Sequence, residues 1–287
     1  MLDLDLDRQG TPPRDAATLV LVRDSPDDKL EVFCVQRHAK SAFLGGAIVF
    51  PGGKVDAADL DPGWADHTTP PRPAPFAAGP AELRALAVAA CREALEEAAI
   101  LPVANRILSQ EELVLLRARA KETSLLACLA ALDLKVDLGA LHPFARWVTP
   151  TAETRRFDAR FFIAVAPRGQ QGAHDDRETT ASFWEPPRET LDRFEAGVVW
   201  LAPPTHRVLE LLASASTSDA AMGLAEHANL EPICPRLVRH QVGDLDTMAL
   251  VLPGDPQHDV AEVRVPGASR YVLTGDKWLP GAPPGRR

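Results

Sequence analysis

The sequence predicts a mixed α/β layered domain followed by a small β-rich tail. Three observations predict it. Segments with strand and helix signals alternate along most of the 287 residues, and one long helical segment carries an apolar stripe. After about residue 230, strand-forming segments predominate again. The length suits one domain with a substantial appendage. We therefore expect a polar leader at 1–15, a main domain at 16–230 with a Pro-rich insertion at 60–80, and a β-rich C-terminal extension at 231–287.

The N-terminal part of the main domain predicts a hairpin and a third short strand. Residues 18–23 and 30–36 are rich in β-formers, and Ser25-Pro-Asp-Asp28 between them is typical of a turn. Residues 47–50 predict a short strand that stops at Pro51-Gly-Gly53. The Pro-rich stretch that follows has no periodicity, so we expect a loop there.

Residues 81–100 predict the principal helix. Pro80 suits its first turn and Pro102 lies just beyond its end. Its apolar residues recur with the 3.6-residue period of a helix packed on a sheet. They are Leu83, Leu86, Ala87, Ala90, Cys91, Ala94, Leu95 and Ala98.

The rest of the chain predicts further helices and strands in alternation. Ser109-Gln-Glu-Glu112 is a capping box, so 113–132 predicts one broken helix or two short ones. A polar loop is expected at 168–180, and Ser218 is the expected cap of a late helix. The other expected helices are 187–196 and 205–212, and the other expected strands are 144–149, 160–165, 247–252, 261–265 and 270–273.

Composition and charge limit the classes of partner. The formal net charge is -9 and the pI is about 5.4, so the chain lacks the overall basic balance that nucleic acid or an anionic membrane surface requires. A phosphorylated small molecule fits, because a divalent cation supplies local positive charge. No apolar run reaches the roughly 18 residues needed to span a bilayer.

Cysteine usage and the termini predict a cytoplasmic, bacterial-style enzyme. The four cysteines are widely spaced without a C-x-x-C pair, which favours buried thiols in a reducing compartment. Residues 1–14 are acidic and lack the apolar segment of a secretory signal, and the chain ends in Pro-Gly-Arg-Arg.

Three carboxylates occupy one face of the principal helix. Glu93 and Glu97 lie about 40° apart around the helix axis, and Glu96 lies about 60° to the other side of Glu93. Such like-charge pairs cost a helix roughly 0.2–0.5 kcal/mol each. A bound Mg²⁺ or Mn²⁺ would offset that repulsion, since these ions prefer hard oxygen ligands. A solvated acidic helix face is the alternative.

The segment upstream favours the metal site. Phe50-Pro-Gly-Gly-Lys-Val-Asp56 predicts a strand that ends in a tight glycine turn, where the backbone can approach a site closely. A glycine turn alone is common. A glycine turn, an acidic loop and a carboxylate helix in that order are far more specific.

In this order the residues resemble the Nudix box, G-x5-E-x7-R-E-U-x-E-E-x-G-U, where U is a bulky aliphatic residue. Gly53 to Asp59 is similar to its first part with Asp in place of Glu, and Arg92 to Ile100 is similar to its second part with Ala94 and Ala99 as departures. Between Asp59 and Arg92 lie 32 residues, where the pattern has seven. Such an insertion resembles the peroxisomal-type coenzyme A diphosphatases and their bacterial relatives, as do the segments 147–150, 155–162, 184–187 and 200–205.

The resemblance implies a Nudix-type α/β/α sandwich around a mixed β-sheet, with a helical insertion and the β-rich extension outside the family pattern. It implies that Glu93, Glu96 and Glu97 bind Mg²⁺ or Mn²⁺. It also makes the Gly53 carbonyl and Asp59 candidate ligands. Arg92 is implied to hold the glutamates in place by ion pairing.

The implied reaction is attack of a metal-bound water on one phosphorus of a diphosphate. The catalytic base is then a glutamate of the box or an acid on a later loop, for which Glu178 is the candidate. Arg37 and Arg155 or Arg156 are candidate ligands of the substrate phosphates, with surface ion pairs as the alternative. Trp147, Phe157 and Phe161 are expected to be core residues rather than stacking platforms.

The expected function is a metal-dependent diphosphatase with a small-molecule nucleotide substrate, of which coenzyme A or an acyl-CoA is the leading candidate. ADP-ribose, dinucleoside polyphosphates and capped RNA are alternatives, and so is a non-catalytic nucleotide-binding module on the same fold. The sequence leaves three roles open for the C-terminal extension: a lid, a substrate-selecting cap, or an element that forms a homodimer.

Overall fold

A seven-stranded mixed sheet forms the framework of the main domain in the computed structural model, which describes residues 4–6, 8, 10–39, 44–175, 179–243 and 245–283. The strands run in the order β3-β2-β1-β6-β5, with β4 paired to β1 and β7 paired to β2. β1 and β6 are parallel, and the other pairs of this sheet are antiparallel. Its strands are β1 (Arg14–Asp24), β2 (Leu30–Arg37), β3 (Ile48–Val49), β4 (Gly52–Lys54), β5 (His142–Val148), β6 (Phe157–Val165) and β7 (Thr179–Glu185).

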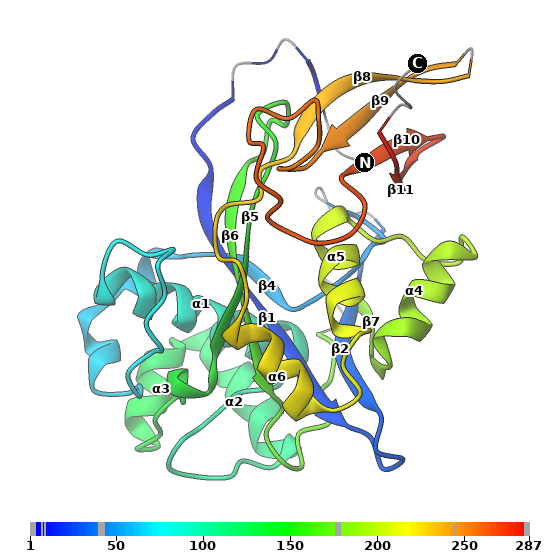
Figure 1. The fold of residues 1–287 in the computed structure, drawn as a ribbon. Coiled ribbons are helices and arrows are strands. Elements are labelled where there is room, and N and C mark those ends of the chain that lie inside the picture. The colour runs from blue at the N-terminus through cyan, green and yellow to red at the C-terminus, as the bar shows by residue number, and fades with distance from the viewer. Residues whose placement is uncertain are drawn as a thin grey trace.

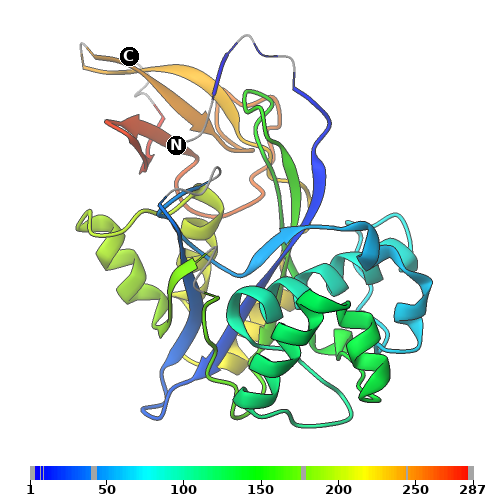
Figure 2. The ribbon, with the colours of Figure 1, turned by 180° about the vertical axis from the view of Figure 1, so that it is seen from behind.

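Helices cover both faces of this sheet, so the predicted sandwich is confirmed (Figures 1 and 2). One layer holds α1 (Pro80–Ala98), α2 (Gln110–Glu122) and α3 (Leu125–Ala131), and the other holds α4 (Pro187–Glu195), α5 (Pro203–Leu212) and α6 (Ser218–Glu226). Alternate residues of a strand face opposite sides of its sheet. Leu19 and Leu21 of β1 accordingly belong to the core under α1, whereas Val20 and Val22 belong to the core under α5.

The Pro-rich insertion packs against the layer of α1. Two 3-10 turns, Ala57–Leu60 and Pro62–Ala65, open it. Trp64 and Phe76 are buried in the core under α1, and the Thr69 amide donates to the Val136 carbonyl at 2.9 Å. The insertion is therefore a tethered part of the domain surface that leads back to Pro80, where α1 begins.

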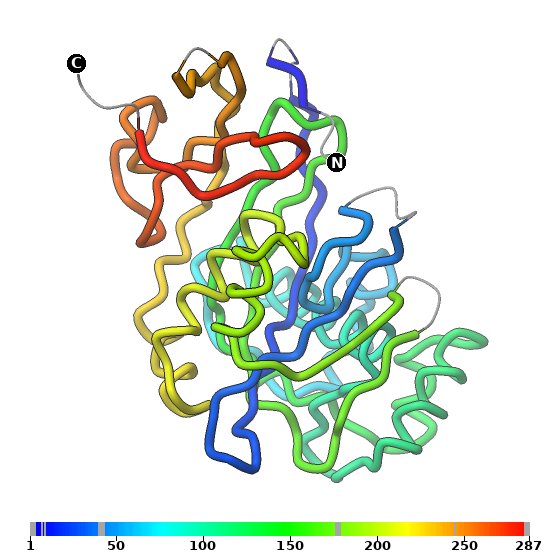
Figure 3. The backbone as a smooth tube through the Cα atoms, turned by 90° about the vertical axis from the view of Figure 1, so that its right-hand side faces the viewer, coloured from blue at the N-terminus to red at the C-terminus, as the bar shows by residue number. Residues whose placement is uncertain are grey.

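A second, four-stranded antiparallel sheet forms the C-terminal extension. It lies beside one end of β5 and β6 and beside α5 (Figures 1 and 3). Its order is β11-β10-β9-β8, and its strands are β8 (Arg236–Val242), β9 (Leu245–Val251), β10 (Arg270–Thr274) and β11 (Lys277–Gly281).

Three local expectations are corrected. Residues 261–265 are not a strand, because β10 already takes the place beside β9 and this segment lies in the connection between them. β7 begins at Thr179, at the end of the expected polar loop, and pairs with β2. Thr217 rather than Ser218 caps α6, since its side chain accepts from the Ala220 amide.

In the described part of the chain, the structure shows neither a membrane-spanning helix nor a disulfide bond. No helix there is long and apolar enough to cross a membrane. The four cysteines are free, and Cys34, Cys91 and Cys128 are buried, as the sequence predicts.

Candidate active site

The glycine turn and the carboxylate helix meet at the edge of β4. The Gly52 amide donates to Glu97 Oε2 at 3.1 Å. A methyl group built on Gly53 would overlap the carboxylate of Glu93, so a side chain at this position would push that carboxylate out of its place. The two glycines thus bring the backbone against two of the three predicted ligands.

Arg92 is the centre of the ionic contacts around this turn. Its Nη1 donates to Glu93 Oε1 at 2.8 Å and to Glu96 Oε1 at 3.3 Å, and its Nη2 donates to the Lys54 carbonyl at 3.0 Å. Burial acts to lower the pKa of Arg92, but the hydrogen bonds to Asp59 and the charges of the nearby carboxylates raise that pKa above its ordinary value. Arg92 therefore stays charged and orients the carboxylates, as the resemblance implied.

Asp59 is a partner of Arg92 in this arrangement. Its Oδ1 accepts from Arg92 Nε at 2.9 Å and its Oδ2 accepts from Arg92 Nη2 at 3.0 Å, a bidentate pair. Oδ2 also accepts from the Asp56 amide, and Asp59 is only 2% exposed. In this structure Asp59 anchors Arg92 across the 32 residues that separate the two in the chain, and its role as a metal ligand stays a prediction.

The donor set suits a hard divalent cation. Glu93 and Glu97 flank the glycine turn, and Glu96, with 43% of its side chain exposed, stands beside them on α1. Carboxylate oxygens on a rigid helix are the ligand type that Mg²⁺ and Mn²⁺ prefer. In the side-chain conformations of the structure, no three His, Cys, Asp or Glu side chains among the described residues converge as a ready-made ligand group. Ion binding would therefore require these glutamates to turn toward a common point.

The end of α1 explains one departure from the box. Ala99 adopts φ 50° and ψ 43°, the left-handed conformation that glycine takes without strain. The Ala99 amide donates to the Leu95 carbonyl and the Ile100 amide donates to the Ala94 carbonyl, which closes the last turn. The usual glycine thus serves as a helix terminator, and alanine fills this role at a cost of about 1 kcal/mol.

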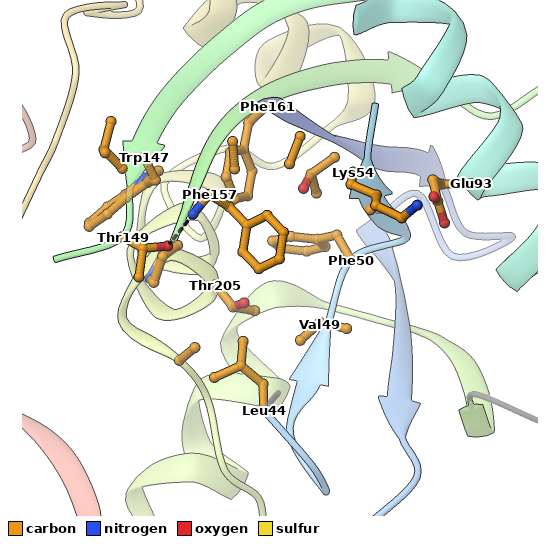
Figure 4. Close-up of a pocket in the computed structure, with 18 of the residues that line it drawn as sticks. Leu44, Val49, Phe50, Lys54, Glu93, Trp147, Thr149, Phe157, Phe161 and Thr205 are labelled. Atoms are coloured by element: carbon orange, nitrogen blue, oxygen red, sulfur yellow. Dashed lines mark hydrogen bonds between the residues drawn. The ribbon is translucent and has the colours of Figure 1, made fainter. Parts of the chain in front are cut away.

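A cavity of about 520 Å³ opens beside the carboxylates (Figure 4). Glu93 and Lys54 lie at one side of it, and Trp147 and Thr149 lie at the opposite side. Between and around them the lining is largely apolar. It includes Phe157 and Phe161 of β6, with Leu44, Val49, Phe50, Pro203 and Pro204. The cavity therefore joins a charged end to an apolar end.

The cavity lining holds one predicted cation and two that were not predicted from the sequence. Arg37 lines the cavity, its Nη1 lies 3.6 Å from Glu97 Oε1, and its buried Nε has no hydrogen-bond partner among the described residues. Arg14 and Lys54 line the cavity as well. The place of Lys54 directly after Gly53 was an available signal, whereas nothing distinguished Arg14 within the expected leader.

Arg155 and Arg156 do not line the cavity, which corrects their expected role with the substrate phosphates. Both precede β6 in the turn after β5, where Arg155 is exposed. Arg156 is held by the carbonyls of Thr149 and Thr11. Glu178, the candidate for the catalytic base, lies outside the described residues.

The three aromatic residues expected in the core are also walls of the cavity. Trp147 is 3% exposed and Phe161 is 6% exposed, yet both face the cavity together with Phe157. Their aromatic character predicted burial, but it did not show that the interior they face is partly open.

Comparisons with known proteins decide the family. A model of the NUDT19 Nudix domain matches residues 77–212. The human acyl-coenzyme A diphosphatase NUDT19 is 31% identical over 280 residues, which cover 81% of this chain and 73% of that protein. The chain belongs to the Nudix hydrolase family, in its NUDT19 branch. It is a Nudix-type diphosphatase, which excludes the alternative of a non-catalytic nucleotide-binding module.

Two further relatives of this Nudix hydrolase cover most of it. The acyl-coenzyme A diphosphatase NUDT19 of Gallus gallus is 28% identical over 325 residues, which cover 93% of this chain and 85% of that protein. The crystal structure of a Nudix hydrolase from Alicyclobacillus acidocaldarius is 32% identical with a TM-score of 0.64, and the match covers 74% of this chain and 96% of that one. The match to the family model begins after the glycine turn. In the structure the Arg92–Asp59 pair is one of the contacts that join the two parts of the Nudix box, together with the Gly52–Glu97 hydrogen bond.

Proposed function

We propose that this Nudix hydrolase cleaves the diphosphate linkage of coenzyme A or an acyl-CoA, with Mg²⁺ or Mn²⁺ as its cofactor. The observation that carries the proposal is the cavity, which joins the carboxylates and three cations to an apolar compartment. Coenzyme A has a matching layout, with a diphosphate in the middle and a long, weakly polar arm on one side. The human and Gallus gallus relatives are acyl-coenzyme A diphosphatases, which supports the same substrate class.

The residues at the charged end have two separate roles, binding the cation and positioning its ligands. Glu93, Glu96 and Glu97 would hold the cation, with the Gly53 carbonyl as a further ligand, and when bound the cation supplies an acidified water and neutralises phosphoryl charge. Arg92 keeps Glu93 and Glu96 in place, and the Gly52 amide keeps Glu97 in place.

Arg37, Arg14 and Lys54 are positioned to neutralise the diphosphate from the cavity side. The water's proton passes to a carboxylate, for which a glutamate of the box and Glu178 are the two candidates. The products would be a phosphopantetheine, or its acyl form, and an adenosine bisphosphate.

A substrate panel tests the proposal. Purified protein with Mg²⁺ or Mn²⁺ is given coenzyme A, octanoyl-CoA, ADP-ribose and a diadenosine polyphosphate, and products are identified by mass spectrometry. We expect coenzyme A or its thioester to have the highest kcat/KM and chelation by EDTA to abolish turnover. A higher kcat/KM for ADP-ribose or the diadenosine compound would reject the substrate assignment.

Substitutions test the site. Glu93→Gln with Glu97→Gln is expected to lower kcat by a factor on the order of 10²–10³, as the loss of preorganised charge stabilisation does in other enzymes. Glu111→Gln is the matched control, because Glu111 is exposed on α2 and outside the cavity lining. Unchanged turnover in the double variant would reject these ligands.

A further inference from the structure

We propose that the C-terminal sheet is a fixed wall of the substrate cavity and that Leu250 on β9 limits the length of the acyl chain that the apolar end accepts. This inference rests on the proposed function, and it assigns one of the three open roles, the substrate-selecting cap, to the extension.

The extension reaches the cavity through two buried residues. Leu250 is 1% exposed, Pro235 is buried just before β8, and both line the cavity. The neighbouring lining residues come from the main domain. They are Trp147 and Phe161 of the main sheet and Pro203, Pro204 and Thr205 at the start of α5. The apolar end is therefore closed by both parts of the chain together.

Buried polar contacts fasten the extension to α5. Tyr271, which is fully buried on β10, lies with its hydroxyl 2.9 Å from His206 Nδ1 and donates to the Pro203 carbonyl at 3.4 Å. Arg207, which is 1% exposed, donates to the Ala268 carbonyl, and a side chain on Gly267 would collide with its guanidinium. These contacts hold β10 against the same helix whose first turn lines the cavity.

The other end of the extension is fastened to the main sheet. The Val148 amide donates to the Ile233 carbonyl at 2.9 Å, and the Ile233 amide donates to the Arg146 carbonyl at 2.8 Å. Within the extension, the fully buried pair of Arg270 and Asp255 ties the connection after β9 to β10. Such attachment at both ends suits a rigid wall and does not suit a lid.

The chemistry of the apolar end favours an alkyl chain. Of the threonines in the cavity lining, Thr149 and Thr205 lie away from Glu93 (Figure 4), and the Thr149 hydroxyl already accepts from the Phe157 amide at 3.0 Å. A ribose with its phosphate needs many more polar partners than this compartment offers. An alkyl chain instead gains by leaving water, and each buried methylene is worth roughly a fourfold gain in binding.

Turnover of saturated acyl-CoAs from acetyl to palmitoyl tests the inference. We expect kcat/KM of the unmodified protein to rise by roughly fourfold per methylene until the compartment is full and then to stop rising. Leu250→Phe is expected to move this limit to shorter chains, and Leu250→Ala is expected to move it to longer ones. The kcat/KM of each protein for every thioester is divided by its own kcat/KM for free coenzyme A, so that a general loss of activity in a variant does not shift the chain-length profile.

The matched controls are Leu245→Phe and Leu245→Ala. Leu245 lies on the same strand, but it is 68% exposed and outside the cavity lining. A chain-length profile that is flat in the unmodified protein overturns the inference even where a Leu250 variant fails to fold. Identical profiles in folded Leu250 variants overturn it too. If the unmodified protein hydrolyses neither coenzyme A nor any thioester, the proposed function itself has failed.

Discussion

Replacing Asp59 by asparagine should destabilise the protein in the absence of metal. The substitution removes a carboxylate that is 2% exposed and makes two hydrogen bonds of 2.9 and 3.0 Å to Arg92. Breaking a buried ion pair costs about 3–5 kcal/mol. Because Arg92 keeps Glu93, Glu96 and the Lys54 carbonyl, and the asparagine amide keeps one acceptor, we expect about 2–3 kcal/mol.

Unfolding by urea in the presence of EDTA measures this loss. Asp56→Asn is the matched control, since Asp56 has 42% of its side chain exposed and lies 3.9 Å from Arg92, so we expect a loss below about 0.5 kcal/mol. The activity of the Asp59 variant should also fall, by roughly 10- to 100-fold, because Arg92 then holds the glutamates less firmly. If Asp59 were a metal ligand instead, its neutralisation would relieve repulsion in the metal-free protein. Unchanged or increased stability in EDTA would therefore refute the anchoring role.

Three further substitutions test other contacts. Gly53→Ala should lower kcat by about 10²-fold, because its methyl displaces Glu93, while far-ultraviolet circular dichroism stays unchanged. Arg37→Gln should lower kcat/KM for coenzyme A roughly 10- to 100-fold, mainly through KM, and an unchanged KM would contradict phosphate binding. Burial and the charge of Arg207 lower the pKa of His206 to about 4 from an ordinary 6.5, so the unfolded chain takes up this proton first as the pH falls. The free energy of unfolding should thus decrease between about pH 6.5 and pH 4, by up to about 3 kcal/mol, and His206→Gln should flatten that decrease in urea titrations.

The chemistry-bearing part of the site was predictable because its signals are local. A helix repeats every 3.6 residues, so the spacing of Glu93, Glu96 and Glu97 was enough to place them on one side of α1. The adjacent glycines similarly predicted a close backbone approach, and Gly53 lies against Glu93 as that reasoning requires. In both cases the interacting atoms are fixed by a few neighbouring residues.

The position of Asp59 was not predictable, since 32 residues separate it from Arg92 where the Nudix pattern has seven. Closing a loop costs only about 0.6 kcal/mol more for each doubling of its length, so the pattern alone cannot say where such a loop returns. In the structure Trp64 and Phe76 pack the insertion onto the core and bring its first turn back to α1. The contact depends on packing within the insertion, which has no periodic signal.

The walls of the cavity were the least predictable part. Leu250 and Pro235 lie more than a hundred residues from α1 in the chain, in a segment that the family pattern did not cover. The strands β8 and β11 were missed because they are partly exposed, so hydrophobic alternation is weak in both. Long-range pairing places these residues, and a single sequence carries no local trace of it.

The predictable and the unpredictable parts of the site have different proposed roles, bond cleavage for the first and substrate selection for the second. The proposed catalytic residues come from one turn and one helix, and Arg92 ties the two together through its hydrogen bonds to Asp59 and Glu93. The proposed compartment for the apolar arm is built from side chains of the main sheet, α5 and the extension. Substitutions at Leu250 can therefore alter the shape of the apolar end without moving any carboxylate. On this reasoning the extension adjusts which chain is accepted, while the glycine turn and α1 determine which bond is broken.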